Sequence, residues 1–219
     1  MNPYFASLTA SPAKRIAAYV LLISIVFFFF NLIYTKFLSK RDNASEDKFW
    51  ERESEANSVR KKSLDDLQYV TVPDDLPYDL RTDDPDVKGY LEVIDSFREK
   101  KMLNLSGYTN TDLKFMYGTA NIETVSKYDT DFGDYISCLQ KWADRLLVLN
   151  ETEAAVKIME YLISVNADMI RTYKYLGERY LSLMENDKFD KLYMTAENLN
   201  SASKSHIINA LDSIKESLS

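Results

Sequence analysis

The 219-residue chain contains only one cysteine and one histidine. Cys138 cannot form an internal disulfide, and Cys138 and His206 alone cannot supply the ligands of a zinc site. His206 follows Ser205 without the glycine-flanked serine of a nucleophile elbow, so we expect a surface histidine rather than a member of a catalytic triad. These shortages predict a protein without a bound metal and without histidine-dependent catalysis.

Glycine is also scarce, with five residues scattered along the chain: Gly89, Gly107, Gly118, Gly133 and Gly177. Phosphate-binding loops need several glycines within a few positions, so neither a Walker motif nor a dinucleotide-binding turn is present. We therefore expect no cofactor.

Acidic residues are missing from the first 41 positions, which hold five lysines or arginines. Because the net charge of the whole chain is −7, the remainder carries −12. Such a surface repels nucleic acid, and no basic stripe offsets it, so we expect no nucleic-acid partner. Adjacent acids do occur at 65–66, 74–75 and 83–84. We expect them to be solvated; an envelope enzyme that uses carboxylates is the alternative function.

A run of twenty residues without a charge, Ile16–Thr35, follows a basic N-terminal tail (1–15). Twenty residues of helix span roughly 30 Å, the hydrocarbon thickness of a bilayer. Tyr19 and Tyr34 lie near its ends, where aromatic rings favour the headgroup region. A cleaved signal peptide is the alternative, but the run is longer than a signal peptide needs and no small-x-small cleavage pattern follows it. We predict an uncleaved, single-pass transmembrane helix.

Basic residues flank this run on both sides, with Lys14 and Arg15 before it and Lys36, Lys40 and Arg41 after it. Counting charges favours a cytoplasmic C-terminal domain. However, a short basic tail is hard to translocate, whereas a large downstream domain crosses largely regardless of its charge. We favour a C-terminal domain outside the cell membrane, and a protease-protection assay on intact protoplasts distinguishes the two orientations.

Residues 36–85 have the composition of a charged linker, with three prolines and no glycine. Such a segment buries too little apolar surface to offset its own chain entropy. Its first part has the charge pattern of a solvated helix, and the prolines near its end favour extended chain. Phe49 and Trp50 fit either an ordinary helix face or a membrane or partner contact, and we favour the former.

The sequence pattern of residues 86–135 predicts an irregular helical segment. Asp84 and Pro85 form a helix start, and apolar residues recur at helical spacing until about Lys101. A second short helix is expected between Thr111, as its cap, and Gly118. A further short helix is expected over 122–128.

Residues 136–203 contain two copies of one pattern, offset by 34 residues. Large and small residues coincide in the two copies, and Ala143 in the first matches Gly177 in the second, where a small side chain allows close helix approach. This pattern resembles the tetratricopeptide repeat, which implies two antiparallel helices per copy. The chain departs from that family at Asn150, at Ala167 and at Phe189. Residues 204–219 have one apolar face, as expected of a capping helix.

The resemblance implies that the first helix of each copy lines a concave protein-binding groove. Transferred to this chain, the groove residues are Gln140, Asp144, Leu147, Arg171, Lys174 and Glu178. Gln140 and Asp144 stand where related repeats carry the lysine and asparagine that grip a C-terminal carboxylate, so that role is not expected. A solvated helix face is the alternative interpretation of these six residues.

The sequence therefore predicts an all-α protein: a transmembrane helix, a linker and an α-solenoid-like domain. The same layout is similar to N-anchored membrane proteins of low-GC Gram-positive bacteria, a resemblance that implies no known activity. The predicted function is non-enzymatic: a membrane-tethered helical repeat that scaffolds or assists the assembly of a protein partner, whose identity the sequence leaves open. No small-molecule substrate is evident.

Overall fold

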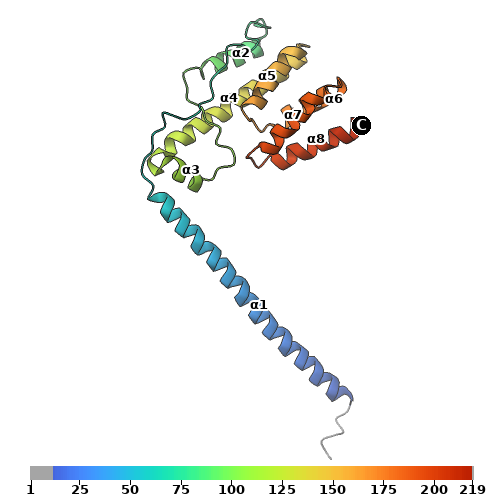
Figure 1. The fold of residues 1–219 in the computed structure, drawn as a ribbon. Coiled ribbons are helices and arrows are strands. Elements are labelled where there is room, and N and C mark those ends of the chain that lie inside the picture. Colours follow the sequence, from blue (N-terminus) through green and yellow to red (C-terminus); the bar gives the residue numbers. More distant parts are fainter. Residues whose placement is uncertain (1–11, 219) are drawn as a thin grey trace, which may run out of the picture. The chain divides into compact units, whose positions relative to one another are not determined.

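The computed structural model describes residues 12–218 and is all-helical over that range, without a β-strand (Figure 1). This confirms the predicted fold class at the level of secondary structure. The predicted basic tail lies mostly outside the described residues. The chain divides into two compact units, Met1–Glu55 and Ala56–Ser219. The first contains most of helix α1, and the second contains every other helix.

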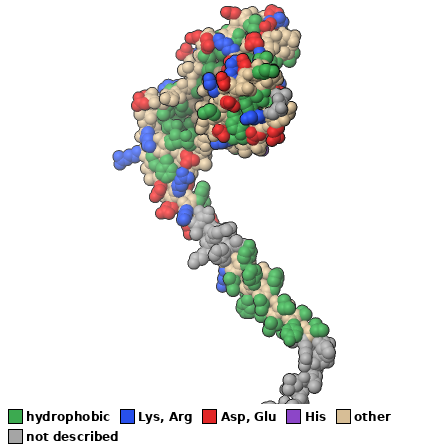
Figure 2. All heavy atoms as spheres, turned by 45° about the vertical axis from the view of Figure 1, so that its right-hand side comes forward, with side chains coloured by type: hydrophobic (Ala, Val, Ile, Leu, Met, Phe, Trp, Pro, Cys, Tyr) green, Lys and Arg blue, Asp and Glu red, His purple; other side chains and the backbone are tan. Residues whose placement is uncertain are grey.

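Helix α1 extends from Pro12 to Asn57. Its segment Tyr19–Lys36 has a mean hydropathy of 1.8 and is not buried, and Figure 2 shows hydrophobic side chains along this part of the helix. The segment is long and apolar enough to cross a membrane, properties that a signal sequence near an N-terminus shares. The helix continues beyond Thr35 into the expected linker because residues 36–57 contain neither glycine nor proline.

Residues 58–84 belong to the second unit and pack against its helices, so they do not form the solvated linker that their composition suggested. The apolar residues of this segment that are buried or packed against the core are Val70, Val72, Leu76, Tyr78 and Leu80. The backbone N–H of Val70 donates to the Met102 carbonyl at 2.9 Å, which forms an isolated antiparallel bridge. Composition suggested a linker because charged residues dominate it, but its apolar side chains pack against two hydrophobic clusters, Leu64, Leu67 and Tyr69 joining the second.

Ion pairs also hold this segment to the helices. Arg98 Nη1 lies 2.8 Å from Asp74 Oδ1, and Lys157 Nζ lies 3.3 Å from Asp75 Oδ2. These pairs are largely exposed, so each contributes little by itself. The adjacent acids at 74–75, which were expected to be solvated, are largely exposed and also pair with basic side chains of the same unit.

Asp84 is buried at the start of α2 (Pro85–Asp95). Its Oδ1 accepts hydrogen bonds from the backbone N–H groups of Asp86 and Val87, both at 3.1 Å, which confirms the predicted cap. Arg145, on α4 (Ile122–Val148), donates to both carboxylate oxygens, at 3.1 and 2.6 Å. The hydrogen bond from Arg145, together with those from the backbone, lowers the pKa of Asp84 from 3.8 to about 2. One side chain thus caps α2 and ties it to α4.

Replacing Asp84 with asparagine is expected to lower the free energy of unfolding at neutral pH, because Arg145 loses its closest charged partner, although Asp86 remains 3.3 Å from Arg145 Nε. The pKa of Asp84 is depressed in the folded state, so its stabilisation is present above the ordinary pKa of 3.8 and is lost as the pH falls through about 2. Urea unfolding curves at neutral pH and at about pH 2 should therefore differ between variant and native chain only at neutral pH.

Asp83→Asn is the matched control, since Asp83 is 78% exposed and 3.9 Å from Arg81. It should leave the unfolding curve unchanged at both pH values. Equal destabilisation by the two asparagine variants would contradict the role assigned to Asp84.

Helix α3 (Asn110–Tyr117) ends at Gly118, as predicted, but its cap is Thr109 and not Thr111. The Thr109 hydroxyl accepts from the Asp112 N–H while the Asp112 carboxylate accepts from the Thr109 N–H, a complete capping box. A short 3₁₀ helix, Thr119–Asn121, leads into α4. Helix α2 ends at Asp95, earlier than the predicted end near Lys101.

Helix α4 is one continuous helix of 27 residues. The sequence suggested a short helix over 122–128 and a separate repeat helix from residue 136. Buried Val125, Phe132 and Ile136 continue one apolar face through this region. Their burial outweighs the cost of Gly133 in a helix interior, about 1 kcal/mol.

The remaining helices are α5 (Thr152–Ser164), α6 (Ile170–Ser182), α7 (Asn186–Asn198) and α8 (Lys204–Leu218). The bounds of α5 and α7 lie 34 residues apart, and the end of α6 lies 34 residues after the end of α4. Figure 1 shows α4 with α5 and α6 with α7 as successive helix pairs, followed by α8.

The turns within the two pairs have the same geometry. Asn150 has a φ of 62° and Met184 a φ of 59°. The next N–H in each turn closes it, with Glu151 donating to Leu146 at 2.9 Å and Glu185 donating to Tyr180 at 2.8 Å. Asparagine tolerates the left-handed conformation well, which explains why the first turn manages without the glycine of the resembling family.

The core of the second unit runs between these pairs. Its largest fully buried side chains include Trp142, Tyr135, Tyr173 and Phe189. Gly177 lies where α6 meets α8: a Cβ there would be 2.8 Å from Leu211 Cδ2 and 3.5 Å from the Phe189 ring. The absence of a side chain at Gly177 thus accommodates Phe189, which replaces the smaller alanine of the first copy.

Candidate functional site

Of the six predicted groove residues, Gln140 and Asp144 belong to a hydrogen-bonded cluster between α4 and α6. Gln140 is buried, its Nε2 donates to Asp144 Oδ1 at 3.0 Å, and its Oε1 accepts from the Thr172 hydroxyl. Arg171 Nε lies 3.1 Å from the same Asp144 oxygen. Gln140 therefore joins two helices and is not available to a partner. Thr172, which is fully buried, completes the cluster and was missed because its partner is 32 residues away.

The other predicted residues are more dispersed. Leu147 is half-buried and packs against the core, whereas Lys174 and Glu178 are exposed on α6. The Arg171 side chain is 71% exposed despite its ion pair. The structure thus leaves a charged, accessible face on α6, and its use in binding stays a prediction.

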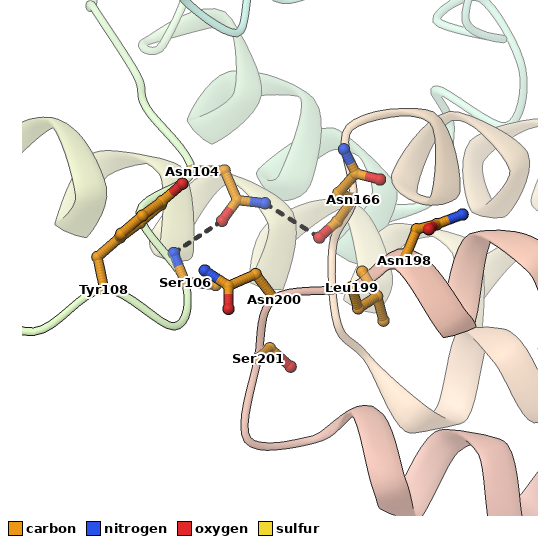
Figure 3. A pocket seen from close by; sticks show the side chains of 8 residues that line it. All are labelled: Asn104, Ser106, Tyr108, Asn166, Asn198, Leu199, Asn200 and Ser201. Carbon is orange, nitrogen blue, oxygen red and sulfur yellow. Dashed lines mark hydrogen bonds between the residues drawn. The ribbon is translucent and has the colours of Figure 1, made fainter.

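A different concave surface lies at one end of the helix pairs, where two hollows of about 200 and 540 Å³ adjoin. The smaller is lined by Asn104, Ser106, Tyr108, Asn166, Asn198, Leu199, Asn200 and Ser201 (Figure 3). The larger is lined by Leu67, Gln68, Tyr69, Val70, Thr71, Leu103, Asn104, Leu105, Tyr108, Met116, Tyr117, Tyr161, Ser164, Val165 and Asn166. None of these side chains is charged, although 28% of the chain is. We call this surface the uncharged groove.

The loop before α3 forms one wall of the uncharged groove and is fixed by two contacts. Asn104 Nδ2 donates to the carbonyls of Val165 and Asn166, at 3.2 and 3.0 Å, and its Oδ1 accepts from the Ser106 N–H at 3.0 Å (Figure 3). Gly107 has a φ of +81°, and a Cβ there would lie 2.1 Å from the Asn200 carbonyl oxygen. These contacts hold the loop against the ends of α5 and α7, so the groove is already formed in the free chain.

The accessible side chains of the uncharged groove are amides and an aromatic ring. Gln68, Asn166 and Asn200 are exposed, and each amide can both donate and accept hydrogen bonds. Tyr108 is 45% exposed and Met116 is 38% exposed. Tyrosine with asparagine and serine, and few charges, is typical of protein-recognition surfaces. Sequence reasoning missed this surface because its residues come from four loops and from parts of α3, α5 and α7 that are distant along the chain.

Another hollow, of about 260 Å³, is lined by residues of α5, α6 and α7. Leu176 and Leu192 form its apolar floor, and Lys188 and Lys191 are on its rim. Tyr180 donates from its hydroxyl to Glu160 Oε1 at 2.8 Å at this site. Burial raises the pKa of Tyr180, so its hydroxyl stays protonated and serves to join the two helix pairs.

The titratable groups whose pKa values are displaced owe their shifts to burial in the core or to contacts that hold the fold together. Burial raises the pKa of Tyr78 to about 12 and also raises the pKa of the Cys138 thiol. The Asp84 carboxyl has a lowered pKa, and its hydrogen-bond partner is Arg145. Within residues 12–218, no three His, Cys, Asp or Glu side chains are grouped as metal ligands. The acids at 65–66, 74–75 and 83–84 do not line the uncharged groove.

No family model, curated protein or solved structure matches this chain. Function therefore has to be inferred from the residues and geometry described above.

Proposed function

We propose that this chain is a single-pass membrane protein whose helical domain binds a protein partner and has no catalytic activity of its own. The apolar, exposed segment Tyr19–Lys36 of α1 supports a membrane anchor. The second unit supports a separate soluble domain, since it has its own core and its charge is predominantly negative. We place this domain outside the cell membrane, for the reason that a short basic tail is hard to translocate.

The proposed domain type is a short solenoid of the tetratricopeptide kind. The 34-residue spacing of helix bounds and the matching turns at Asn150 and Met184 support this assignment. Two helix pairs are fewer than a stable stack usually needs. Helix α2 packs on α4 at one side and α8 packs on α6 and α7 at the other, so these helices supply the missing layers.

The uncharged groove is the observation that carries the proposed binding function. It is preformed, it presents free amides beside Tyr108, and it lacks charge in a chain that is acidic beyond residue 41. An uncharged peptide segment of a partner satisfies the amides without requiring a buried counter-charge. The exposed face of α6, with Arg171 and Lys174, is a second contact surface for the same partner.

Photo-crosslinking in native membranes tests this proposal. A benzophenone amino acid at Met116, in the uncharged groove, is expected to capture a discrete partner, whereas the same probe at Met194 should not. Met194 is 60% exposed but lies outside the groove, which makes it a matched control. Tyr108→Ala should reduce capture from position 116 at least about five-fold, because aromatic anchors contribute most of the binding energy in such sites.

A separate Arg171→Ala/Lys174→Ala variant tests the α6 face. Reduced capture in that variant would add this face to the binding site. Capture of the same species from positions 116 and 194, unaffected by Tyr108→Ala, would refute binding at the groove.

A further inference from the structure

The polar side chains of the apolar run in α1 share one helix face. Asn31 follows Ser24 by seven residues and precedes Thr35 by four, and Ala17 precedes Ser24 by seven. Residues separated by three, four or seven positions lie on the same side of a helix. Ile23, Phe29 and Ile33 lie elsewhere around the helix, so this face differs from the rest of the run.

The side chain of Asn31 is less well hydrogen-bonded than those of Ser24 and Thr35. The Ser24 hydroxyl donates to the Val20 carbonyl at 2.8 Å, and the Thr35 hydroxyl donates to the Asn31 carbonyl at 2.9 Å. The Asn31 side chain makes one contact, from Nδ2 to the Phe27 carbonyl at 3.5 Å, which is near the limit for a hydrogen bond. A carboxamide offers two donors and two acceptor sites, so most of the capacity of Asn31 is unused.

The unused hydrogen-bonding capacity of Asn31 is costly because Asn31 lies near the middle of the proposed membrane span. The centre of Tyr19–Lys36 is between residues 27 and 28, so Asn31 is only about 5 Å from it along the helix. An amide without partners in hydrocarbon costs several kcal/mol. Residues 12–218 contain one candidate membrane span, so no second helix from this described part of the chain can supply the partner.

We propose that α1 associates with α1 of a second copy of this chain through the face of Ser24 and Asn31. This inference rests on the proposed membrane insertion. All copies insert in the same direction, so Asn31 is at the same depth in each, and a two-fold axis places each Asn31 opposite its equivalent. The amide is self-complementary, since its N–H donates to the carbonyl oxygen of the other copy.

Two further residues of the face favour close helix approach, although Phe27 and Phe28 also lie on it. Ala17 and Ser24 are small, and small residues are enriched where membrane helices pack together. A single asparagine in a seven-residue repeat also sets the register and the number of helices in coiled coils. The association therefore gives a membrane-anchored pair of domains and not isolated copies.

Energy transfer between full-length chains tests this inference. Donor- and acceptor-labelled copies are reconstituted together in phosphatidylcholine vesicles, and transfer is measured while the protein is diluted with lipid. Asn31→Leu is expected to weaken association about five- to thirty-fold, the range for interhelical hydrogen bonds in model peptides. Asn31→Gln, which keeps the amide group, should associate as strongly as the native chain. Ile33→Leu, on another face, is the control and should behave as the native chain.

Extraction of the vesicles with alkaline carbonate reports insertion separately. Retention of the native chain in the membrane, with transfer that Asn31→Leu weakens and Asn31→Gln preserves, supports the inference. Retention without transfer, or with transfer unaffected by Asn31→Leu, overturns it and leaves the proposed anchor standing. Release of the native chain by carbonate refutes the anchor and the inference together.

Discussion

Trp142→Ala is expected to lower the free energy of unfolding by roughly 3–5 kcal/mol, the range for removing a large buried aromatic side chain. Trp142 is fully buried on α4 and stacks on Tyr78 with ring centroids 5.6 Å apart. Its removal leaves a cavity in the core and also takes away the surface on which residues 58–84 pack. The second effect should expose that segment to proteolysis before the helices unfold.

Urea unfolding of the full chain in detergent micelles, followed by far-ultraviolet circular dichroism, measures this effect. Trp50→Ala is the matched control, because Trp50 is 59% exposed on α1 and should change stability little. Similar loss of stability in both variants would show that the core does not depend on Trp142 as the structure indicates.

Gly177→Val is expected to lower the free energy of unfolding by roughly 1–3 kcal/mol, the usual cost of overpacking a core. The first atom of the new side chain would be 2.8 Å from Leu211 Cδ2, so the Leu211 side chain must move, and we expect α8 to shift with it. The valine methyl groups extend the clash towards Phe189. Since α8 covers the last helix pair, its displacement should also increase amide hydrogen exchange in α7.

Gly133→Ala is the control for this second substitution. Gly133 also lies within a helix, but a Cβ there meets no atom within 4 Å, so alanine should raise stability by up to about 1 kcal/mol. Thermal or urea unfolding should therefore show a loss of stability for Gly177→Val and a gain of stability for Gly133→Ala. A stabilising effect of Gly177→Val would contradict the close packing of α6 and α8.

The differences between expectation and structure have one physical origin in most cases. Composition described residues 58–84 as a linker because charged side chains dominate there. The segment is nevertheless packed, since Leu76 is buried, Asp74 pairs with Arg98 in the turn after α2, and Asp75 pairs with Lys157 on α5. Similarly, the repeat pattern predicts an exposed groove residue at Gln140, whereas in the structure Gln140 accepts a hydrogen bond from Thr172. In each case the deciding contact joins residues far apart along the chain.

The sequence by itself determined the local features of this protein. The uncharged run Ile16–Thr35 and the helix start at Asp84 depend on residues within a few helical turns of one another, and the 34-residue spacing is read from the sequence alone. Tertiary structure alone decided that α4 is continuous and that Asp84 is joined to Arg145. It also decided that four loops and parts of α3, α5 and α7 form the uncharged groove. Periodicity records which side of a helix is apolar, but it does not record which distant loop comes to lie against that helix.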